Sequence, residues 1–280
     1  MLLGMQEISG IEIAKKIIDE LKTKPKPEKI LAAILVGENP ASVSFLKQKE
    51  KIAKELGVDF RVYDFPEEIK NDDLRKEVEK IASFKKVGGV IVQLPLPAHL
   101  NPQYILNVIP REKDIDVLGE RALGAFYAGR NPVLPPSVGV VDEIIRIMNY
   151  ELRMMRVVVI GAGFLIGKPI TTWLQNKVAE LTIFDEYTQD LRSRLKNVDL
   201  IISGVGKANL FNTEDLSENT TVIDFGYDMS SGKIAGDFNP AIHNSKFIIH
   251  YTPTPNGTGP ILVAKIFENF YNLNNGKVQG

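Results

Sequence analysis

Three glycines stand in a spacing that suits a phosphate-binding turn. Gly161, Gly163 and Gly167 come directly after the apolar run Val157–Ile160 and open a segment of helical pattern. In a strand–turn–helix unit, glycines let backbone N–H groups and the positive helix end approach a pyrophosphate. Asp185 follows the next apolar run, where an acid would bind the adenosine ribose of a dinucleotide. The order of these features predicts a dinucleotide site, and the alternative is a tight turn without a ligand.

The charge of Asp185 also bears on the choice of cofactor. The 2′-phosphate of NADP carries about −1.5 to −2 charges. Two like charges about 4 Å apart repel by roughly 4 kcal/mol at an effective dielectric constant of 20. Glu186 adds to the negative charge. The local chemistry therefore favours NAD over NADP.

Lysine, glutamine and aspartate are residue types that could handle protons or orient a ligand, and the family resemblance given below singles out Lys49, Gln93 and Asp116 among them. A lysine in a partly closed apolar cleft has a lowered pKa and can exchange protons near neutrality. Gln93 ends an apolar run just before a proline-rich string, and ligands bind at strand ends of α/β sheets. On residue types alone, Lys49 also fits a solvated helix face, and Asp116 also fits a turn.

The elements that must position these residues follow an alternating pattern in the first half of the chain. Helical periodicity predicts helices, short apolar runs predict strands, and the order βαβαβ predicts a parallel α/β layer. A loop rich in glycine and proline is expected over residues 114–136. The predicted helices cover residues 11–21, 39–56 and 72–82, and the predicted strands cover residues 30–36, 58–63 and 89–93.

The second half predicts another α/β unit after a helix over residues 139–148. Helices are expected between at least the first three strands, and a last helix over 261–273 is expected to pack back on the first domain. The chain is long enough for two domains: residues 1–140 with the C-terminal helix 262–280, and residues 141–261. The predicted strands are Val157–Ile160, Leu181–Phe184, Asp199–Ser203, Thr221–Phe225 and Phe247–Tyr251.

Composition excludes several classes of protein. The 280 residues carry a formal charge of −1, which argues against a general nucleic-acid binder. The chain has no cysteine, so a disulfide scaffold, a thiol nucleophile and a cysteine-based zinc site are excluded. Three scattered histidines predict no metal site. No stretch approaches the apolar length of a membrane span, and Glu7 and Glu12 interrupt any signal-peptide pattern. We expect a cytoplasmic protein without membrane partners.

Several longer strings place the chain in a known family. They are Ser9–Ala14, Val36–Ser42, Val92–Pro97 with His99, Lys113–Asp116, Gly167–Pro169, Val222–Gly226 and Thr252–Pro260. The strings Gln-Leu-Pro-Leu-Pro and Thr-Pro-x-Pro-x-Gly-x-Gly-Pro are the most specific. In this order, nearly from end to end, the chain resembles the methylenetetrahydrofolate dehydrogenase/cyclohydrolases.

The resemblance implies a folate-binding N-terminal domain and a Rossmann-type C-terminal domain that binds NAD or NADP, with no metal. It implies oxidation of 5,10-methylenetetrahydrofolate and hydrolysis of the methenyl product to 10-formyltetrahydrofolate, in a homodimer formed through the Rossmann domains. Lys49 would be central to hydrolysis, Gln93 would contact Lys49 and the ligand, and Asp116 would hold the pterin. The implied substrate-binding residues are Phe45, Lys49, Val92, Gln93, Leu94, Asp116, Pro255 and Gly257. The implied cofactor-binding residues are Gly161, Ala162, Gly163, Leu165, Asp185, Glu186, Gly226 and Tyr227.

Some residues depart from the family pattern. Phe45 replaces the usual tyrosine, which keeps an aromatic face but removes a proton-carrying hydroxyl. Val117-Leu118-Gly119 replaces the usual Gly-Phe-His, and Leu134–Gly139 replaces the usual Pro-Cys-Thr-Pro-x-Gly loop. Ala162 replaces an arginine that could pair with a 2′-phosphate. Most members of the family use NADP, whereas Ala162 and Asp185 favour NAD.

Three alternatives remain open from the sequence. Phe45 raises the possibility of a monofunctional NAD-dependent dehydrogenase. A Rossmann oxidoreductase of the shikimate-dehydrogenase type would also pair a lysine with an aspartate, although the Pro- and Gly-rich strings oppose it. A nucleotide sensor that lost its chemistry would not need Lys49 and Asp116.

Overall fold

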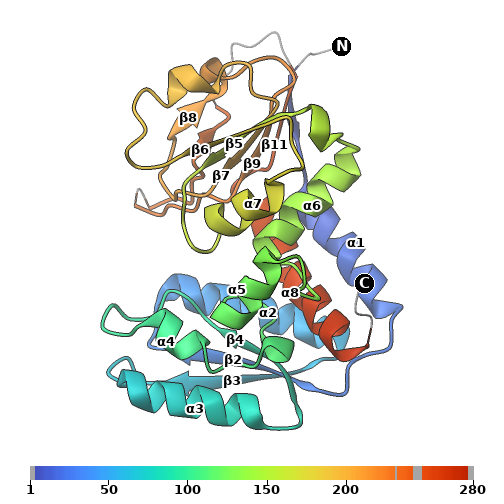
Figure 1. Cartoon of the computed structure of the whole chain (residues 1–280), viewed down its shortest axis with the longest axis vertical. Coiled ribbons are helices and arrows are strands. Elements are labelled where there is room, and N and C mark those ends of the chain that lie inside the picture. Colours follow the sequence, from blue (N-terminus) through green and yellow to red (C-terminus); the bar gives the residue numbers. More distant parts are fainter. Residues whose placement is uncertain (1–3, 231, 242–247, 277–280) are drawn as a thin grey trace. The chain divides into compact units, whose positions relative to one another are not determined.

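The structure is a computed structural model that describes residues 4–230, 232–241 and 248–276 (Figure 1). The chain forms two compact units. Unit 1 combines residues 1–14 with 137–262, and unit 2 combines residues 15–136 with 263–280. Residues 1–3, and residues 277–280 of the predicted C-terminal helix, lie outside the described residues. The grouping differs from the predicted boundaries at the N-terminus because an early strand joins the sheet of unit 1.

Unit 2 is built on a three-stranded parallel sheet in the order β3-β2-β4. Helices α2 and α3 connect these strands and lie on opposite sides of the sheet (Figure 1). Every residue of β2 and β4 is buried, which explains their wholly apolar sequences. The bounds are β2 Ile30–Val36, α2 Pro40–Leu56, β3 Asp59–Phe65, α3 Asn71–Ser83 and β4 Val87–Val92.

Helix α2 has a strong signal at each end. The side chain of Asn39 accepts hydrogen bonds from the backbone N–H groups of Ala41 and Ser42, both at 3.1 Å, and therefore caps the N-terminus. Gly57 ends the helix in the left-handed conformation, with φ of 66°, which glycine adopts without a steric penalty. These two residues confirm the predicted bounds of α2 and fix its register.

The rest of unit 2 contains the elements α4 Pro102–Leu106, η1 Arg111–Lys113 and α5 Glu120–Tyr127. Helix α5 lies in the segment that the sequence predicted as a loop, so that prediction was wrong there. Gly119 and Gly124 make the segment look turn-like, but Ala122 packs into a cluster with Val117 and Val133. Burial of this apolar face outweighs the low helix propensity of glycine.

The last helix, α8 Thr258–Asn274, packs against unit 2 from residue 263 onward, as the sequence predicted. The Asn269 amide donates hydrogen bonds to the carbonyls of Ile115 and Leu134, both at 2.8 Å. The Asn274 amide donates to the carbonyl of Gly88 at 3.1 Å. These bonds tie the helix to β4 and to the loops that follow it.

Unit 1 is built on a parallel sheet in the order β6-β5-β7-β9-β11-β1. The chain runs from β5 outward to β6 and then crosses to β7 on the other side of β5. Ligands bind at such a switch point, beside the carboxyl ends of the strands. The bounds are β1 Met5–Glu7, β5 Arg156–Ile160, β6 Glu180–Phe184, β7 Leu200–Ser203, β9 Thr221–Asp224 and β11 Ile249–Tyr251. Phe247, where the last strand was predicted to begin, lies outside the described residues.

Shorter elements complete unit 1. The expected helix between β5 and β6 is present as α7, whereas the one between β6 and β7 is only the 3-10 turn η3 Arg192–Leu195. The remaining elements are α6 Pro136–Met148, η2 Leu152–Met154, α7 Gly167–Leu174, β8 Phe211–Asn212, η4 Thr213–Asp215 and β10 Phe238–Asn239. Helix α1 Gly10–Lys22 begins in unit 1 and continues into unit 2 from Lys15 onward. Strand β1 was not predicted. Within the described ranges, no helix has the length and apolar character needed to cross a membrane.

Candidate functional site

Lys49 differs from the other lysines of helix α2. It is 5% exposed, whereas Lys47, Lys51 and Lys54 are exposed. The helical period places Lys49 on the same face as Ser42, Leu46 and Ala53, and all four are buried. The register fixed by the caps of α2 therefore turns one lysine of the run inward.

Gln93 is the hydrogen-bond partner of this buried lysine. The Lys49 ammonium donates to Gln93 Oε1 at 2.7 Å. The amide nitrogen of Gln93 donates to the carbonyl of Leu94 at 2.9 Å, which orients the amide oxygen toward Lys49. Gln93 follows β4 directly, so the carboxyl end of a buried parallel strand presents the amide. Val92 beside it is buried and Leu94 is half-buried.

Asp116 supplies the second charge of this group. Burial lowers the pKa of Lys49, and the charge of Asp116 opposes that shift. Burial likewise raises the pKa of Asp116, and the charge of Lys49 opposes it. Each group favours the charged form of the other, although no ion pair within 4.0 Å joins them in the described structure. Phe45 lies one turn before Lys49 on α2 and is half-buried.

The loop that carries Asp116 is held by the buried carboxyl of Asp114. Asp114 Oδ2 accepts hydrogen bonds from the backbone N–H groups of Leu118 at 3.0 Å and Gly119 at 2.8 Å. Burial raises the pKa of Asp114 to about 6, although these backbone bonds oppose the shift. Val117 lies between Asp116 and Leu118 in this loop. Its φ of 57° is strained for a β-branched residue.

Ser42 belongs to the same face of α2, and sequence reasoning missed it. Its hydroxyl is buried and has no hydrogen-bond partner in the described structure, although buried polar groups are normally paired. Ser42 is one turn before Phe45 and two turns before Lys49 along the helix. That helical spacing from Phe45 and Lys49 was the feature of the sequence that could have identified Ser42 as part of the same face. Unit 2 therefore presents an aromatic ring, a hydroxyl, an ammonium, an amide and a carboxyl, which suits a ligand with ring and polar edges.

The glycine turn of unit 1 is tightly packed at two positions and open at the third. A Cβ on Gly161, whose φ is 96°, would lie 3.1 Å from the carbonyl oxygen of Gly204. A Cβ on Gly167 would lie 1.7 Å from the carbonyl oxygen of Gly161, whereas a Cβ on Gly163 would meet nothing within 4 Å. The turn folds against its own helix and leaves space at Gly163, which fits close approach of a pyrophosphate.

The other predicted cofactor residues follow the carboxyl ends of three strands of unit 1, namely β5, β6 and β9. Asp185 follows β6, and its Oδ1 accepts hydrogen bonds from the Tyr187 N–H at 3.0 Å and the Thr188 hydroxyl at 3.2 Å. These bonds fix the carboxylate, which is exposed. Gly226 follows β9 and is buried. The remaining predicted cofactor residues are exposed: Ala162, Leu165, Glu186 and Tyr227.

Two predicted substrate residues, Pro255 and Gly257, belong to unit 1. Pro255 is exposed and Gly257 is buried, and both follow β11. A Cβ on Gly10 would lie 1.6 Å from the carbonyl oxygen of Gly257. The segment therefore packs directly on the first turn of α1.

Family models match most of the chain. The model for "Tetrahydrofolate dehydrogenase/cyclohydrolase, catalytic domain" matches residues 8–116. The model for "Tetrahydrofolate dehydrogenase/cyclohydrolase, NAD(P)-binding domain" matches residues 135–277. The first match includes Lys49, Gln93 and Asp116, and the second includes the glycine turn.

Individual proteins are similar over nearly the whole length. "Bifunctional protein FolD" of Clostridium botulinum is 34% identical over 273 residues, which are 94% of this chain and 96% of that protein. The crystal structure of the bifunctional FolD dehydrogenase/cyclohydrolase from Campylobacter jejuni matches with a TM-score of 0.91 and 32% identity, covering 98% of this chain and 100% of that one. The Trypanosoma brucei enzyme, complexed with NADP and an inhibitor, matches with a TM-score of 0.90 and 27% identity, covering both chains completely.

Proposed function

Because the chain belongs to the tetrahydrofolate dehydrogenase/cyclohydrolase family, we propose that Lys49, Gln93 and Asp116 form its folate site and that the glycine turn of unit 1 holds its dinucleotide. Membership confirms the resemblance inferred from the motifs. The protein is a methylenetetrahydrofolate dehydrogenase and methenyltetrahydrofolate cyclohydrolase. The monofunctional and shikimate-dehydrogenase-type alternatives are not favoured.

In the oxidation step, the side chains of unit 2 position the folate. The glycine turn of unit 1 would hold NAD(P), which would supply the acceptor for the hydride that leaves the methylene carbon. The folate nitrogens share the resulting positive charge, so the protein supplies orientation and electrostatics. Asp116 binds the N–H edge of the pterin, and the ring of Phe45 stacks on it. No metal is needed for either role.

In the hydrolysis step, Lys49 handles the proton. A water oxygen bonds to the methenyl carbon while the neutral amine of Lys49 takes a proton from that water. The bond from this carbon to N5 then breaks, and N5 takes up a proton. The hydroxyl on the carbon loses its remaining proton as the formyl C=O forms on N10, so one proton is released overall. Gln93 keeps the Lys49 nitrogen in place through its 2.7 Å hydrogen bond. Burial supports this role because it lowers the pKa of Lys49 toward the range of a useful base.

The buried Lys49–Gln93 hydrogen bond is the observation that carries the proposal, and Lys49→Ala tests it. We expect methenyl hydrolysis to fall by about 10²–10⁴-fold, the usual contribution of general acid–base catalysis, while part of the hydride transfer survives. The matched control is Lys47→Ala, on the exposed face of the same helix. Equal hydrolysis by both variants, once spontaneous hydrolysis is subtracted, would refute the role of Lys49.

For the cofactor, we propose that the protein prefers NAD to NADP. The exposed carboxylate of Asp185, fixed by its bonds to Tyr187 and Thr188, would repel a 2′-phosphate, and Ala162 offers no positive charge. The NADP complex of the Trypanosoma brucei enzyme makes NADP the competing choice. Initial rates with each cofactor decide between them, and Asp185→Ser should shift the ratio of kcat/KM values toward NADP. An unchanged ratio would place the 2′ position elsewhere.

We also propose that two copies pair through unit 1, along strand β6. This strand stands at the end of the sheet order, with β5 on its only paired side in the described structure. Ile183 on β6 is 47% exposed, and an unpaired edge with an exposed apolar side chain favours association. Sedimentation should show a dimer that Ile183→Lys dissociates. Ile147→Lys, on the surface of α6, is the control and should remain dimeric. A dimeric Ile183→Lys variant would refute this edge.

A further inference from the structure

Asp237 holds the loop that follows strand β7 in unit 1. This side chain is fully buried. Its Oδ2 accepts hydrogen bonds from the Ser203 hydroxyl at 2.5 Å and the Val205 N–H at 2.8 Å, and its Oδ1 accepts one from the Lys207 N–H at 2.8 Å. Three donors from β7 and the loop after it therefore converge on one carboxyl group.

Asp224, the last residue of β9, holds the loop that follows that strand. Its Oδ1 accepts a hydrogen bond from the Gly226 N–H at 2.7 Å, and its Oδ2 accepts one from the Phe238 N–H at 2.9 Å. Each of the two acidic side chains packs against a glycine that lies near the other acid in the sequence. A Cβ on Gly226 would lie 2.4 Å from Asp237 Oδ1, and a Cβ on Gly236 would lie 2.2 Å from Asp224 Oδ2. The carboxyl groups and the two backbone segments therefore form one packed unit.

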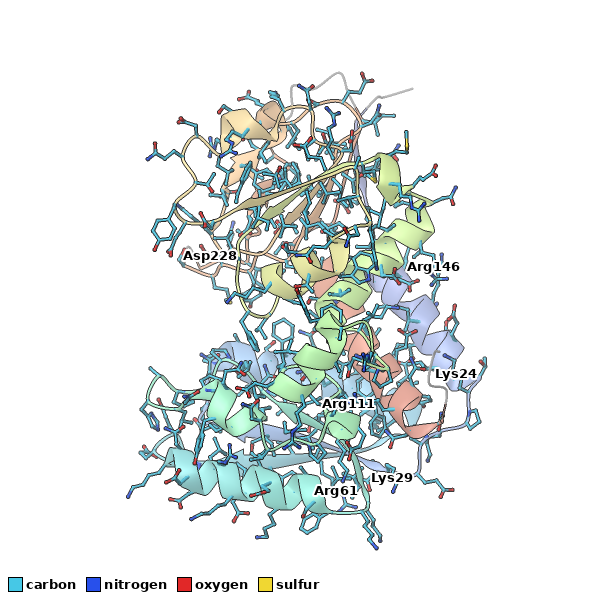
Figure 2. The ribbon with its side chains drawn as sticks, in the orientation of Figure 1. Lys24, Lys29, Arg61, Arg111, Arg146 and Asp228 are labelled. Atoms are coloured by element: carbon cyan, nitrogen blue, oxygen red, sulfur yellow. The ribbon has the colours of Figure 1, made fainter. Side chains whose placement is uncertain are left out.

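This packed unit touches the glycine turn. A Cβ on Gly161 would lie 3.1 Å from the Gly204 oxygen and 3.2 Å from Val205 Cγ2, so the segment that Asp237 holds forms a wall of the turn. Asp228, labelled in Figure 2, extends the same support because it accepts a hydrogen bond from the Ala208 N–H at 3.1 Å. The buried carboxyl groups of Asp224 and Asp237 thus connect the loops after β7 and β9, and the loop after β7 packs against the turn after β5.

We propose that Asp224 and Asp237 are positioning residues that set the loops after β7 and β9 in the geometry that accepts the dinucleotide. The inference rests on the proposed placement of the cofactor at this edge. It adds that cofactor affinity depends on the protonation state of Asp224, a residue that touches no reacting atom.

The charges around the pair determine the direction of that dependence. Burial and the charge of Asp237 raise the pKa of Asp224 to about 7. The neutral side chains of Thr252 and Thr258 bond its backbone. The other charged residues on the loops after β7 and β9 are Lys207, Asp228 and Lys233. A pyrophosphate at the adjacent turn adds negative charge, which favours the protonated form of Asp224. Affinity for the cofactor should therefore fall as the pH rises through about 7.

The test measures dissociation constants of NADH and NADPH for the full chain between pH 5.5 and 8.5. For the wild type we expect affinity about tenfold weaker at the upper limit, which corresponds to a pKa of Asp224 one unit higher in the complex. Asp224→Asn should remove this dependence because the side chain no longer titrates. Asp237→Asn should move the transition to lower pH, because one cause of the raised pKa is lost, and should weaken binding throughout.

The matched control is Asp199→Asn. Asp199 precedes β7 at the other end of the strand and bonds Arg156, so this variant should keep the wild-type profile. Methenyl hydrolysis by each variant reports whether unit 2 is intact. A flat wild-type profile, or an unchanged profile in Asp224→Asn, would refute the inference while leaving the cofactor site in place. Failure of the wild type to bind either dinucleotide would reject the site itself, and the inference with it.

Discussion

At the residue scale, the backbone of Val117 is strained beside Asp116, a proposed substrate-binding residue. Its φ of 57° costs an L-amino acid roughly 1–2 kcal/mol, whereas glycine adopts it freely. Its side chain is fully buried in a cluster with Ala122 and Val133. Packing of this side chain, together with the hydrogen bonds to Asp114, maintains a conformation that the residue would otherwise avoid.

A pair of variants measures this strain. Elsewhere, replacing alanine by glycine destabilises a protein by roughly 0.5–1 kcal/mol. At position 117 we expect the reverse, so that Val117→Gly is at least as stable as Val117→Ala in urea unfolding. Both should be less stable than the wild type, because both lose buried apolar surface. The usual order, with the alanine variant more stable, would show that the position is not strained.

The unpaired hydroxyl of Ser42 leads to a second prediction. A buried hydroxyl without a partner costs free energy, so Ser42→Ala should leave the free energy of unfolding unchanged or raise it. If the hydroxyl binds the folate, the same variant should raise the KM for 5,10-methylenetetrahydrofolate. Ser44→Ala, on an exposed position of α2, is the control. An unchanged KM in Ser42→Ala would show that the Ser42 hydroxyl does not bind the folate.

Lys49 illustrates what the sequence can and cannot predict about a site. Its residue type and its family string pointed to proton chemistry, but the helical pattern alone could not separate it from Lys47, Lys51 and Lys54. The separation depends on the register of α2, which Asn39 and Gly57 fix, and on the packing of that helix. The carboxyl pair Asp224 and Asp237 was not predicted because its partners come from three separate segments.

At the element scale, the turn between β5 and α7 offers a test of its proposed ligand. Gly163→Ala adds a methyl group that meets no protein atom, so stability should be unchanged while the KM for the dinucleotide rises. Gly167→Ala would place a Cβ 1.7 Å from the Gly161 oxygen, so it should lower both stability and affinity. Thermal unfolding and cofactor titration of the two variants measure these effects. Unchanged cofactor affinity in Gly163→Ala would argue against close approach of the pyrophosphate.

The elements themselves were predictable where local signals were strong. Strand β2 is an uninterrupted apolar run, and α2 has a cap at each end, so their bounds follow from the sequence. Helix α5 was missed because its glycines suggest a turn and its stabilising partners lie in other segments. Strand β1 was missed because three residues carry little pattern, and its pairing with β11 depends on residues far along the chain.

At the scale of the whole molecule, the buried acids make stability depend on pH. The pKa of Asp114 is raised to about 6 and that of Asp224 to about 7, whereas an unfolded aspartate titrates near 3.9. Between these values the native state binds more protons than the unfolded state, so stability falls as the pH rises. Each acid contributes about 1.4 kcal/mol per pH unit within its range.

Urea unfolding at pH 5 and pH 7.5 measures this effect. We expect the wild type to have the lower free energy of unfolding at pH 7.5. Asp114→Asn and Asp224→Asn should each reduce the difference between the two conditions, because each removes one titrating group. A difference that stays the same in both variants would assign the pH dependence to other residues.

The pairing of β1 with β11 has a consequence for the order of folding. Glu7 accepts a hydrogen bond from the Tyr251 hydroxyl at 2.8 Å, across 244 positions of sequence. At about 5–20 residues per second, a ribosome releases Glu7 roughly 12–50 s before Tyr251. The local contacts of unit 2 are available early, whereas this edge of the unit 1 sheet pays the loop-closure entropy of nearly the whole chain. Complete assembly of that sheet is therefore a late event of synthesis, and until then the nascent N-terminal strand has no partner.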